Sequence, residues 1–189
     1  RFYERNGLHL FEDVISFEID TRIARPGDLH QGRPVQLTSV ESPLLDRIIA
    51  IDHAAFPWLW RNSRLEFEHY LLTPGVEVWA LYDERGEPIS YVGITSYSGW
   101  GPLDRVAVEP ARQGEGHGER AVRFAVARLQ RLGARRVGLS TQRSNLRSQR
   151  LYRRIGFQQT WQTTIGFMGH SHRALCSKRP RSSMETRQA

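Results

Sequence analysis

The chain has 189 residues, of which 39% are hydrophobic and 25% charged, a balance typical of a globular domain with a substantial core. A single cysteine excludes an internal disulfide, and no apolar run is long enough to span a bilayer, so we expect a cytoplasmic protein without a membrane segment. The net charge of +7 favours an anionic partner, although an arginine-rich solvated helix face would account for it as well.

The first twenty residues repeat a pattern that recurs near the end of the chain. Residues 1–8 (RFYERNGL) read like residues 150–157 (RLYRRIGF), and residues 15–17 fall where residues 165–167 would fall. We interpret residues 1–20 as the tail end of a preceding unit of the same kind or as an extra strand. A coincidental helix-end pattern is the alternative. Prolines and glycines then dominate residues 21–34, which are predicted to be a linker.

The next part of the chain predicts one strand, two helices and a hairpin. A strand suits residues 35–40, and apolar residues at helical spacing predict a helix that ends near Phe56. A second helix is expected over residues 63–72, and its Tyr70 is expected to supply apolar packing surface rather than to line a pocket. Residues 76–82 and 89–97 then alternate as two strands around a turn, which predicts a hairpin.

The stretch from Asp104 to Gly118 combines a strand, a glycine-rich turn and the start of a helix. A predicted strand over residues 103–108 stops before Pro110, and a turn with glycines at 114, 116 and 118 leads into a predicted helix over residues 116–132. Glycines let the backbone approach an anion closely, and the free N–H groups of a helix start hold negative charge. The stretch therefore predicts a phosphate-binding turn. It is neither a P-loop nor a dinucleotide fingerprint, because the Gly-Lys-Ser/Thr and the third-glycine offset are missing.

The remaining pattern alternates between strand and helix. We predict a strand over residues 136–141, a helix over residues 146–155 with Asn145 as its N-cap, and a last strand over residues 157–167. This order predicts an α/β fold with a mixed, mostly antiparallel central sheet and helices on both faces. Residues 170–189 are polar and basic and are expected to be a mobile tail.

Two motifs in this order resemble those of a known family. The sequence QGEGHG at residues 113–118 is similar to Gln/Arg-x-x-Gly-x-Gly, the pyrophosphate-binding signature of GNAT-type N-acetyltransferases. Residues 145–157 (NLRSQRLYRRIGF) resemble the later motif of that family, Asn-x-x-Ala/Ser-x-x-Leu-Tyr-x-x-x-Gly-Phe. We therefore interpret residues 35–169 as a GNAT domain, and the repeat at the start suggests the C-terminal unit of a tandem GNAT protein.

The resemblance implies transfer of an acetyl group from acetyl-coenzyme A, without a metal, to a primary amine of a small molecule, peptide or protein. It implies that backbone groups of the glycine-rich turn hold the pyrophosphate and that the preceding strand pairs with the pantetheine arm. Asn145 would contact this arm or a water beside it. The expected cofactor-binding residues are Val106, Ala107, Val108, Gln113, Gly114, Glu115, Gly116, His117, Gly118 and Asn145.

The resemblance also implies the catalytic groups. Tyr152 stands at the family's acid position, where it would protonate the departing thiolate, and ring packing is the alternative role. The base is less defined, because ribosomal-protein alanine acetyltransferases carry a Glu where this chain has Ser140. Asp104 is the candidate base, since strand alternation places its side chain on the same face as Val106 and Val108. A plain surface Asp and deprotonation through water remain open.

Other functions are weighed against this enzyme. A GNAT unit could bind a coenzyme or a protein without turnover, in a dimer or a tandem arrangement. Nucleic-acid binding through the arginine-rich segments is disfavoured, since no recognition motif accompanies them. His170, His172 and Cys176 are disfavoured as metal ligands because no partner cluster accompanies them.

Overall fold

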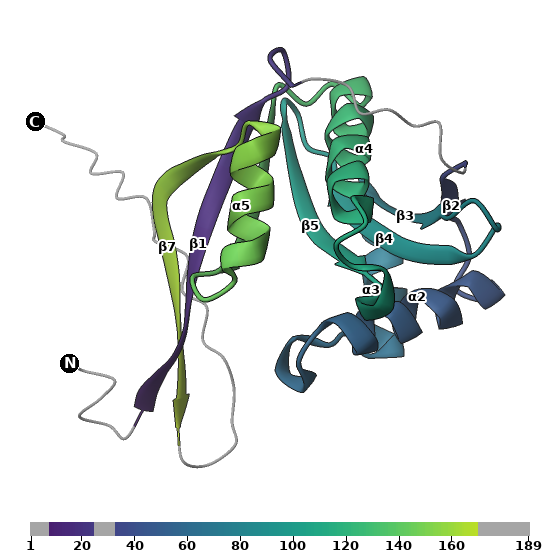
Figure 1. The fold of residues 1–189 in the computed structure, drawn as a ribbon, viewed down its shortest axis with the longest axis horizontal. Helices are drawn as coiled ribbons and strands as arrows, with labels where there is room; N and C mark the ends of the chain where they lie inside the picture. The colour runs from purple at the N-terminus through teal and green to yellow at the C-terminus, as the bar shows by residue number, and fades with distance from the viewer. Residues whose placement is uncertain (1–7, 25–32, 170–189) are drawn as a thin grey trace, which may run out of the picture.

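A computed structural model describes residues 8–24 and 33–169, which build a seven-stranded sheet in the order β2-β3-β4-β5-β6-β1-β7 (Figure 1). The strands are β1 (Leu8–Asp20), β2 (Val35–Leu37), β3 (Val76–Tyr82), β4 (Pro88–Thr95), β5 (Trp100–Val108), β6 (Arg136–Gln142) and β7 (Gln158–Gly169). The helices are α2 (Pro43–Ala55), α3 (Arg64–Leu71), α4 (His117–Arg131) and α5 (Leu146–Ile155). Among these strands only β5 and β6 pair in parallel, so the predicted mixed, mostly antiparallel α/β sheet is confirmed.

Local capping signals set the ends of the helices. Ser63 caps α3 in a capping box with Glu66, because each side chain bonds the backbone N–H of the other residue. The Asn145 side chain accepts from the Ser148 N–H and begins α5, as predicted. Gly156 ends α5 in the left-handed region, with φ of 114°, which explains why a glycine stands there.

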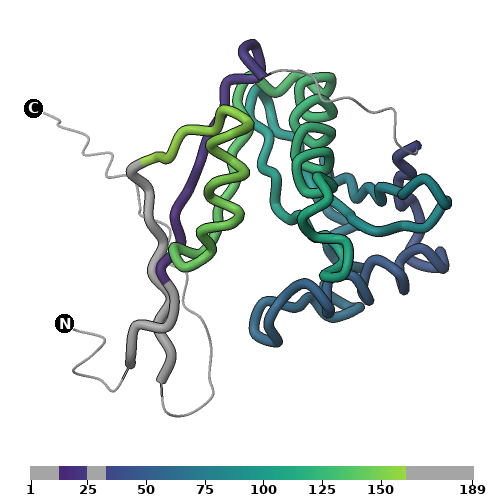
Figure 2. Tube along the Cα trace, viewed as in Figure 1, coloured from purple at the N-terminus to yellow at the C-terminus, as the bar shows by residue number. Residues whose placement is uncertain are grey.

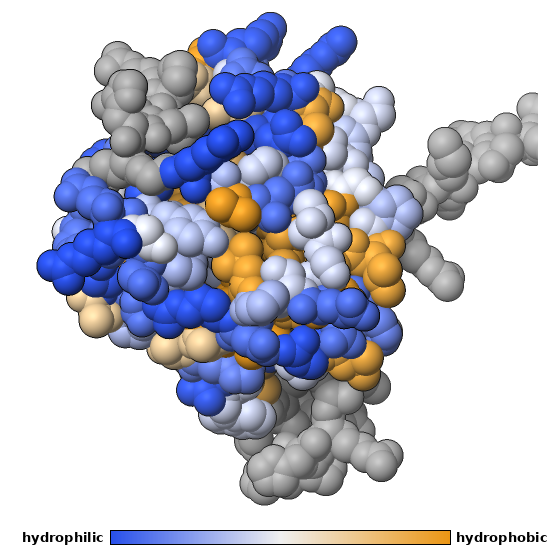
Figure 3. All heavy atoms as spheres, turned by 90° about the vertical axis from the view of Figure 1, so that its right-hand side faces the viewer, coloured by the Kyte–Doolittle hydropathy of each residue, from blue (hydrophilic) through white to orange (hydrophobic). Residues whose placement is uncertain are grey.

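The helices cover the sheet with two separate cores. One cluster packs α4 and α5 against one face of the sheet and contains the predicted apolar stripe of α4, for example Val122 and Leu129. The other cluster packs α2 and α3 against the opposite face of β3, β4 and β5. Figure 3 shows the side of the molecule that lies on the right in Figure 1, where β2 and β3 are. Hydrophobic residues gather at the centre of this side, and hydrophilic residues surround them.

The N-terminal strand lies inside the sheet of this domain. β1 pairs with β6 on one side and with β7 on the other, and Ile15, Phe17 and Ile19 are buried in the core under α4 and α5. Figure 2 shows this purple strand running beside the yellow-green C-terminal part of the chain. The sheet therefore includes residues 8–20, which lie before the predicted start of the domain at residue 35. Their origin in a preceding unit stays a prediction.

Two parts of the sheet diverge next to β5. β5 and β6 pair only from Trp100 to Pro102 with Arg136 to Gly138, and beyond these residues the strands separate (Figure 1). The opening leaves one edge of the C-terminal half of β5 without a neighbouring strand among the described residues.

No helix within residues 8–24 and 33–169 is long and apolar enough to cross a membrane. His170, His172 and Cys176, which the sequence disfavours as metal ligands, lie outside the described residues.

Candidate active site

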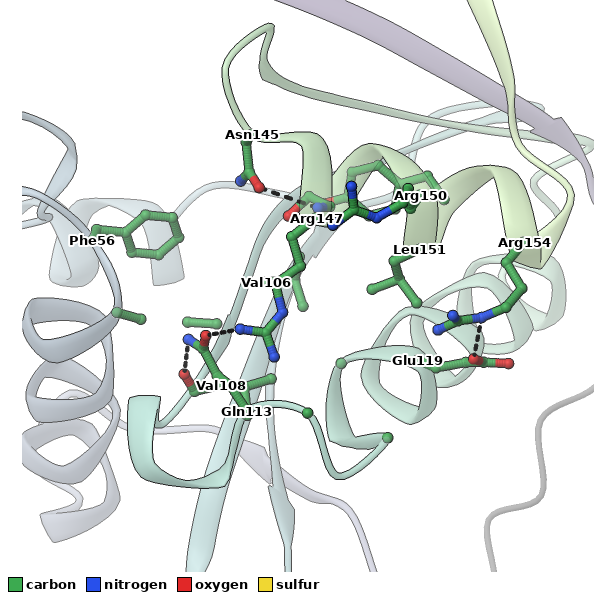
Figure 4. A pocket seen from close by; sticks show the side chains of 17 residues that line it. Phe56, Val106, Val108, Gln113, Glu119, Asn145, Arg147, Arg150, Leu151 and Arg154 are labelled. Carbon is green, nitrogen blue, oxygen red and sulfur yellow. Dashed lines mark hydrogen bonds and ion pairs between the residues drawn. The ribbon is translucent and has the colours of Figure 1, made fainter.

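A cavity of about 440 Å³ lies where β5, the glycine-rich turn and α5 meet (Figure 4). The predicted cofactor-binding residues that line it are Val106, Ala107, Val108, Gln113, Gly114, Gly116, Gly118 and Asn145. Asn145 thus meets residues that lie 27 to 39 positions before it in the sequence. The cavity opens beside the C-terminal half of β5, which does not pair with β6. An extended ligand could pair with this free strand edge in place of a strand.

The glycine-rich turn lines this cavity with Gly114, Gly116 and Gly118. Gly114 and Gly116 have φ of 99° and 89°, a left-handed conformation that disfavours other residues. Among the described residues, no backbone group accepts a hydrogen bond from the N–H groups of Gly114 or Gly116, and α4 begins directly after them. Free N–H groups before a helix N-terminus can bind an anion, and phosphate binding by this turn stays a prediction.

The backbone of Val108 faces the cavity. The Glu109 N–H donates to the Ile89 carbonyl, and in an antiparallel pair such bonds alternate, so the neighbouring pair Ser90–Val108 points its backbone groups away from each other. The Val108 carbonyl accepts a bond of 3.1 Å from the Gln113 side chain instead. The Val108 N–H is therefore available to a ligand in the opening.

Arginines of α5 form the other wall of the cavity. Arg147 donates to the Gln113 side chain over 2.8 Å and spans the cavity mouth, with its guanidinium beside Gly114 (Figure 4). Arg150 and Arg154 line the same wall, and Arg154 pairs with Glu119 over 3.0 Å. The sequence motif did not single out these three residues. Their spacing of three and four positions, which puts them on one face of a helix, was the available signal.

Two predicted cofactor-binding residues turn their side chains away from the cavity. The His117 ring and the Glu115 carboxylate lie 3.2 Å apart, and both residues line a separate cavity beside Asp83 and Arg112. Arg112, which could have met a phosphate, pairs instead with Asp83 at 2.7 Å and Glu115 at 2.9 Å. Its hydrogen bond holds the pKa of Asp83 at about 2. These ion pairs hold the turn to the loop after β3, on the side away from the first cavity.

A second cavity of about 270 Å³ adjoins the first on the side of α2 and the 3-10 turn Trp58–Trp60. Phe56, Val106, Asn145, Ser148 and Tyr152 line both cavities, which marks the junction between them. Asp104, Trp60 and Leu139 line only the second. Two cavities that meet at a tyrosine could hold two reacting molecules.

Tyr152 is buried and reaches this junction from α5. Its ring packs against Phe17 and Phe157, with centroids 5.8 Å and 6.0 Å away. Burial raises the pKa of Tyr152 to about 12, and a hydrogen bond with Ser148 opposes the shift. An unperturbed tyrosine hydroxyl has a pKa of about 10. The phenol is a weaker acid than that and stays protonated across the physiological range.

Asp104 faces the opposite way from the predicted direction. A β-bulge in β5 interrupts its register with β4 between Gly93 and Ile94, and the alternation of side chains shifts there. The Asp104 carboxylate therefore meets Tyr70 of α3, whereas Val106 packs against the core under α4. The expectation that Asp104 and Val106 share a face is wrong. Desolvation raises the pKa of Asp104, against the effect of hydrogen bonds from Thr95 and Tyr70.

Arg105 of β5 links the sheet to α2 and to the 3-10 turn beside the second cavity. It pairs with the buried Asp52 of α2 at 2.5 Å and bonds the Tyr91 hydroxyl at 2.9 Å and the Trp60 carbonyl. Its guanidinium lies over the Phe56 ring, 4.2 Å from the centroid. Arg105 is the one cationic side chain among the described residues that line the second cavity, and its charge is therefore neutralised by Asp52. Ser140 lines this cavity too, and its hydroxyl bonds Ser16 of β1 over 3.0 Å.

Comparisons with known proteins agree with this geometry. A sequence profile of the acetyltransferase (GNAT) family matches residues 45–157. A protein of Bacillus subtilis (strain 168), named as a candidate ribosomal protein bS18 alanine N-acetyltransferase, is 27% identical over 114 residues, which are 60% of this chain and 74% of that protein.

Solved structures share the fold. A GCN5-related N-acetyltransferase from Sphaerobacter thermophilus matches with a TM-score of 0.63 and 18% identity over 85% of this chain. The ribosomal-protein-S18-alanine N-acetyltransferase of Escherichia coli matches with a TM-score of 0.56 and 21% identity, over 67% of this chain and 78% of that one. This chain spans 52% of the length of the Sphaerobacter chain.

Proposed function

Because the chain belongs to the acetyltransferase (GNAT) family, we propose that it transfers an acetyl group from acetyl-coenzyme A to a primary amine. The observation that carries this proposal is the position of Tyr152, which lines both adjoining cavities. One cavity has the groups to hold a phosphorylated thioester, and the other has a carboxylate for an amine. The reacting atoms would meet between them.

The first cavity fits the coenzyme. Unpaired N–H groups of the glycine-rich turn, the N-terminus of α4 and the arginines of α5 all favour a diphosphate. The backbone of Val108 would pair with the pantetheine arm or polarise the thioester carbonyl. Acetyl-coenzyme A supplies an acetyl group activated as a thioester. The Gln113–Arg147 bridge would have to open to admit the arm.

The side chains of the second cavity would move the protons. Asp104 would take one proton from the attacking ammonium group, which frees the nitrogen lone pair to form the new C–N bond. As the C–S bond breaks, Tyr152 would donate its proton to the sulfur and recover the second proton that the nitrogen loses. A free thiol has a pKa of about 8.5. Because the pKa of Tyr152 is about 12, its proton would pass to the sulfur only as the tyrosine recovers the nitrogen proton, so the phenol relays a proton and does not stay ionised.

The charges of the second cavity suggest the acceptor class. Within the part of the chain that the structure describes, Asp104 accepts hydrogen bonds only from neutral hydroxyl groups, while Asp52 forms an ion pair with Arg105. A cavity with this balance favours an ammonium group and disfavours a carboxylate beside it. Phe56, Trp60 and Leu139 would contact an apolar body. We therefore expect amines without an adjacent carboxylate to be better acceptors than free amino acids.

The test is an acetyl-transfer assay of the purified chain. Thiol release from acetyl-coenzyme A is measured with a panel that pairs each amine with its carboxylated analogue. The panel includes a peptide that begins with alanine, because of the bacterial relative named for that activity. Rapid release with some amines supports the proposal. Thermal stabilisation by acetyl-coenzyme A without release indicates a binding module, and a steeply salt-dependent shift with DNA alone indicates nucleic-acid binding.

Arg147→Met is expected to raise KM for acetyl-coenzyme A about tenfold and to leave kcat nearly unchanged. The reason is that Arg147 lies beside the phosphate-binding turn, and a charged hydrogen bond is worth roughly 1.5 kcal/mol. Methionine keeps most of the aliphatic stem. Initial rates at varied coenzyme and salt concentrations measure the effect.

Arg143→Met is the matched control for this prediction. Arg143 is exposed, pairs with Asp13 and lines neither cavity. A variant at this position removes the same charge without touching the proposed phosphate site. If both variants raise KM equally, the effect is one of net charge, and Arg147 does not contact the coenzyme.

A further inference from the structure

Two hydroxyl groups, from α3 and from β4, bond the same oxygen of Asp104. Tyr70 of α3 donates to Oδ2 over 2.5 Å, and Thr95 of β4 donates to the same Oδ2 over 2.6 Å. No described residue bonds Oδ1. The β-bulge in β5 makes both bonds possible, because it turns the carboxylate toward these two hydroxyls. One carboxylate oxygen is thus held from two sides, and the other is left for a further donor.

A glycine makes room for this arrangement. The Tyr70 ring crosses β4 at Gly93, where an added Cβ would lie 2.9 Å from both the Cε1 carbon and the hydroxyl oxygen of Tyr70. Glycine weakens the middle of a strand and often marks a close approach, here that of a side chain. Burial, together with the neighbouring carboxylate, raises the pKa of Tyr70 well above its usual value, so Tyr70 remains a donor.

The other charged and titratable groups around Asp104 are engaged elsewhere. Arg105, the next residue of β5, pairs with Asp52, and Glu18 of β1 pairs with Arg136 at 3.7 Å. Tyr152 of α5, which shares the second cavity, bonds Ser148. Ion pairs therefore do not hold the Asp104 carboxylate, and its direct contacts are the hydroxyls of Tyr70 and Thr95.

We propose that Tyr70 is a positioning residue: with Thr95 it fixes Oδ2 of Asp104 and so directs Oδ1 at the ammonium group of the acceptor. This inference rests on the proposed acetyl transfer. It gives a role to a residue of α3 that the sequence pattern assigned to packing alone. It also explains why a bulge, a glycine in a strand and a threonine occur at neighbouring positions of β4 and β5.

The test compares Tyr70→Phe, Thr95→Val and the parent chain. Both hydroxyls stabilise the ionised carboxylate, so removal of either one raises the pKa of Asp104. The acidic limb of the kcat/KM profile should therefore move to higher pH in each variant, with a loss of about tenfold at neutral pH, and KM for acetyl-coenzyme A should not change. Gly93→Ala, which displaces the ring but keeps the hydroxyl, should behave like Tyr70→Phe.

Tyr97→Phe is the control, because Tyr97 is exposed and makes no hydrogen bond to Asp104. A ¹³C titration of the Asp104 carboxyl by NMR gives a readout that needs no turnover. An unchanged Asp104 pKa in Tyr70→Phe and Thr95→Val overturns the positioning role, whether or not the chain transfers acetyl groups. A raised pKa without amine acetylation by the parent keeps the hydrogen-bond arrangement and rejects the role toward an acceptor.

Discussion

Tyr152→Phe is expected to lower kcat about 100-fold, the usual contribution of a positioned proton donor, with the KM for acetyl-coenzyme A within a factor of about two. The substitution removes only the hydroxyl, since the ring that packs against Phe17 and Phe157 is retained. Because the Tyr152 pKa is about 12, the parent should show no loss of activity from this group below about pH 11. Steady-state kinetics from pH 6 to pH 10 measure both effects.

The structure also supplies the controls for this variant. Ser148→Ala removes the hydrogen bond that lowers the pKa of Tyr152 but leaves the donor in place, so it should cost far less than Tyr152→Phe. Tyr97→Phe changes an exposed tyrosine that lines neither cavity. Should Tyr152→Phe turn over as fast as the parent, Tyr152 is a packing residue and the proposed donor is wrong.

Asp104→Asn is expected to lower kcat/KM for the amine by about 1000-fold, within the range for loss of a general base. The amide cannot accept the ammonium proton, although Tyr70 and Thr95 can still donate to its oxygen. In the parent, the rate should fall as the pH drops through the Asp104 pKa, which desolvation raises above its ordinary value. The variant should lose this acidic limb.

Stability distinguishes this carboxylate from a structural one. A carboxyl group whose pKa is raised in the folded state stabilises the fold while it is protonated, and this stabilisation is lost as the pH rises through the folded pKa. Asp104→Asn should therefore unfold at an equal or higher denaturant concentration than the parent at pH 7, and this advantage should shrink toward pH 3. A large loss of stability at pH 7, or an undiminished rate, would contradict the assignment of Asp104 as the base.

Much of the first cavity could be predicted from local sequence. The glycine-rich turn, the start of α4 and the Asn145 cap are short-range features, because each depends on neighbouring residues that set backbone angles or satisfy free N–H groups. The two motifs therefore located the turn and α5 within one or two residues. Their assigned roles in binding and catalysis stay predictions, and assays of the variants described above test them.

The second cavity depended on contacts that the sequence pattern does not encode. Tyr70 and Asp104 lie 34 positions apart, and only the packing of α3 over β4 brings them together. The bulge in β5 reversed the direction predicted for Asp104, since one extra residue shifts the alternation of a strand. Likewise, β1 lies inside the sheet because strand pairing over more than 100 positions places it beside β6. Sequence alone thus determined the glycine-rich turn and the helix that follows it, whereas tertiary structure decided that Asp104 meets Tyr70 and Thr95 beside the second cavity, because hydrogen bonds between distant side chains form only after the sheet and helices have packed.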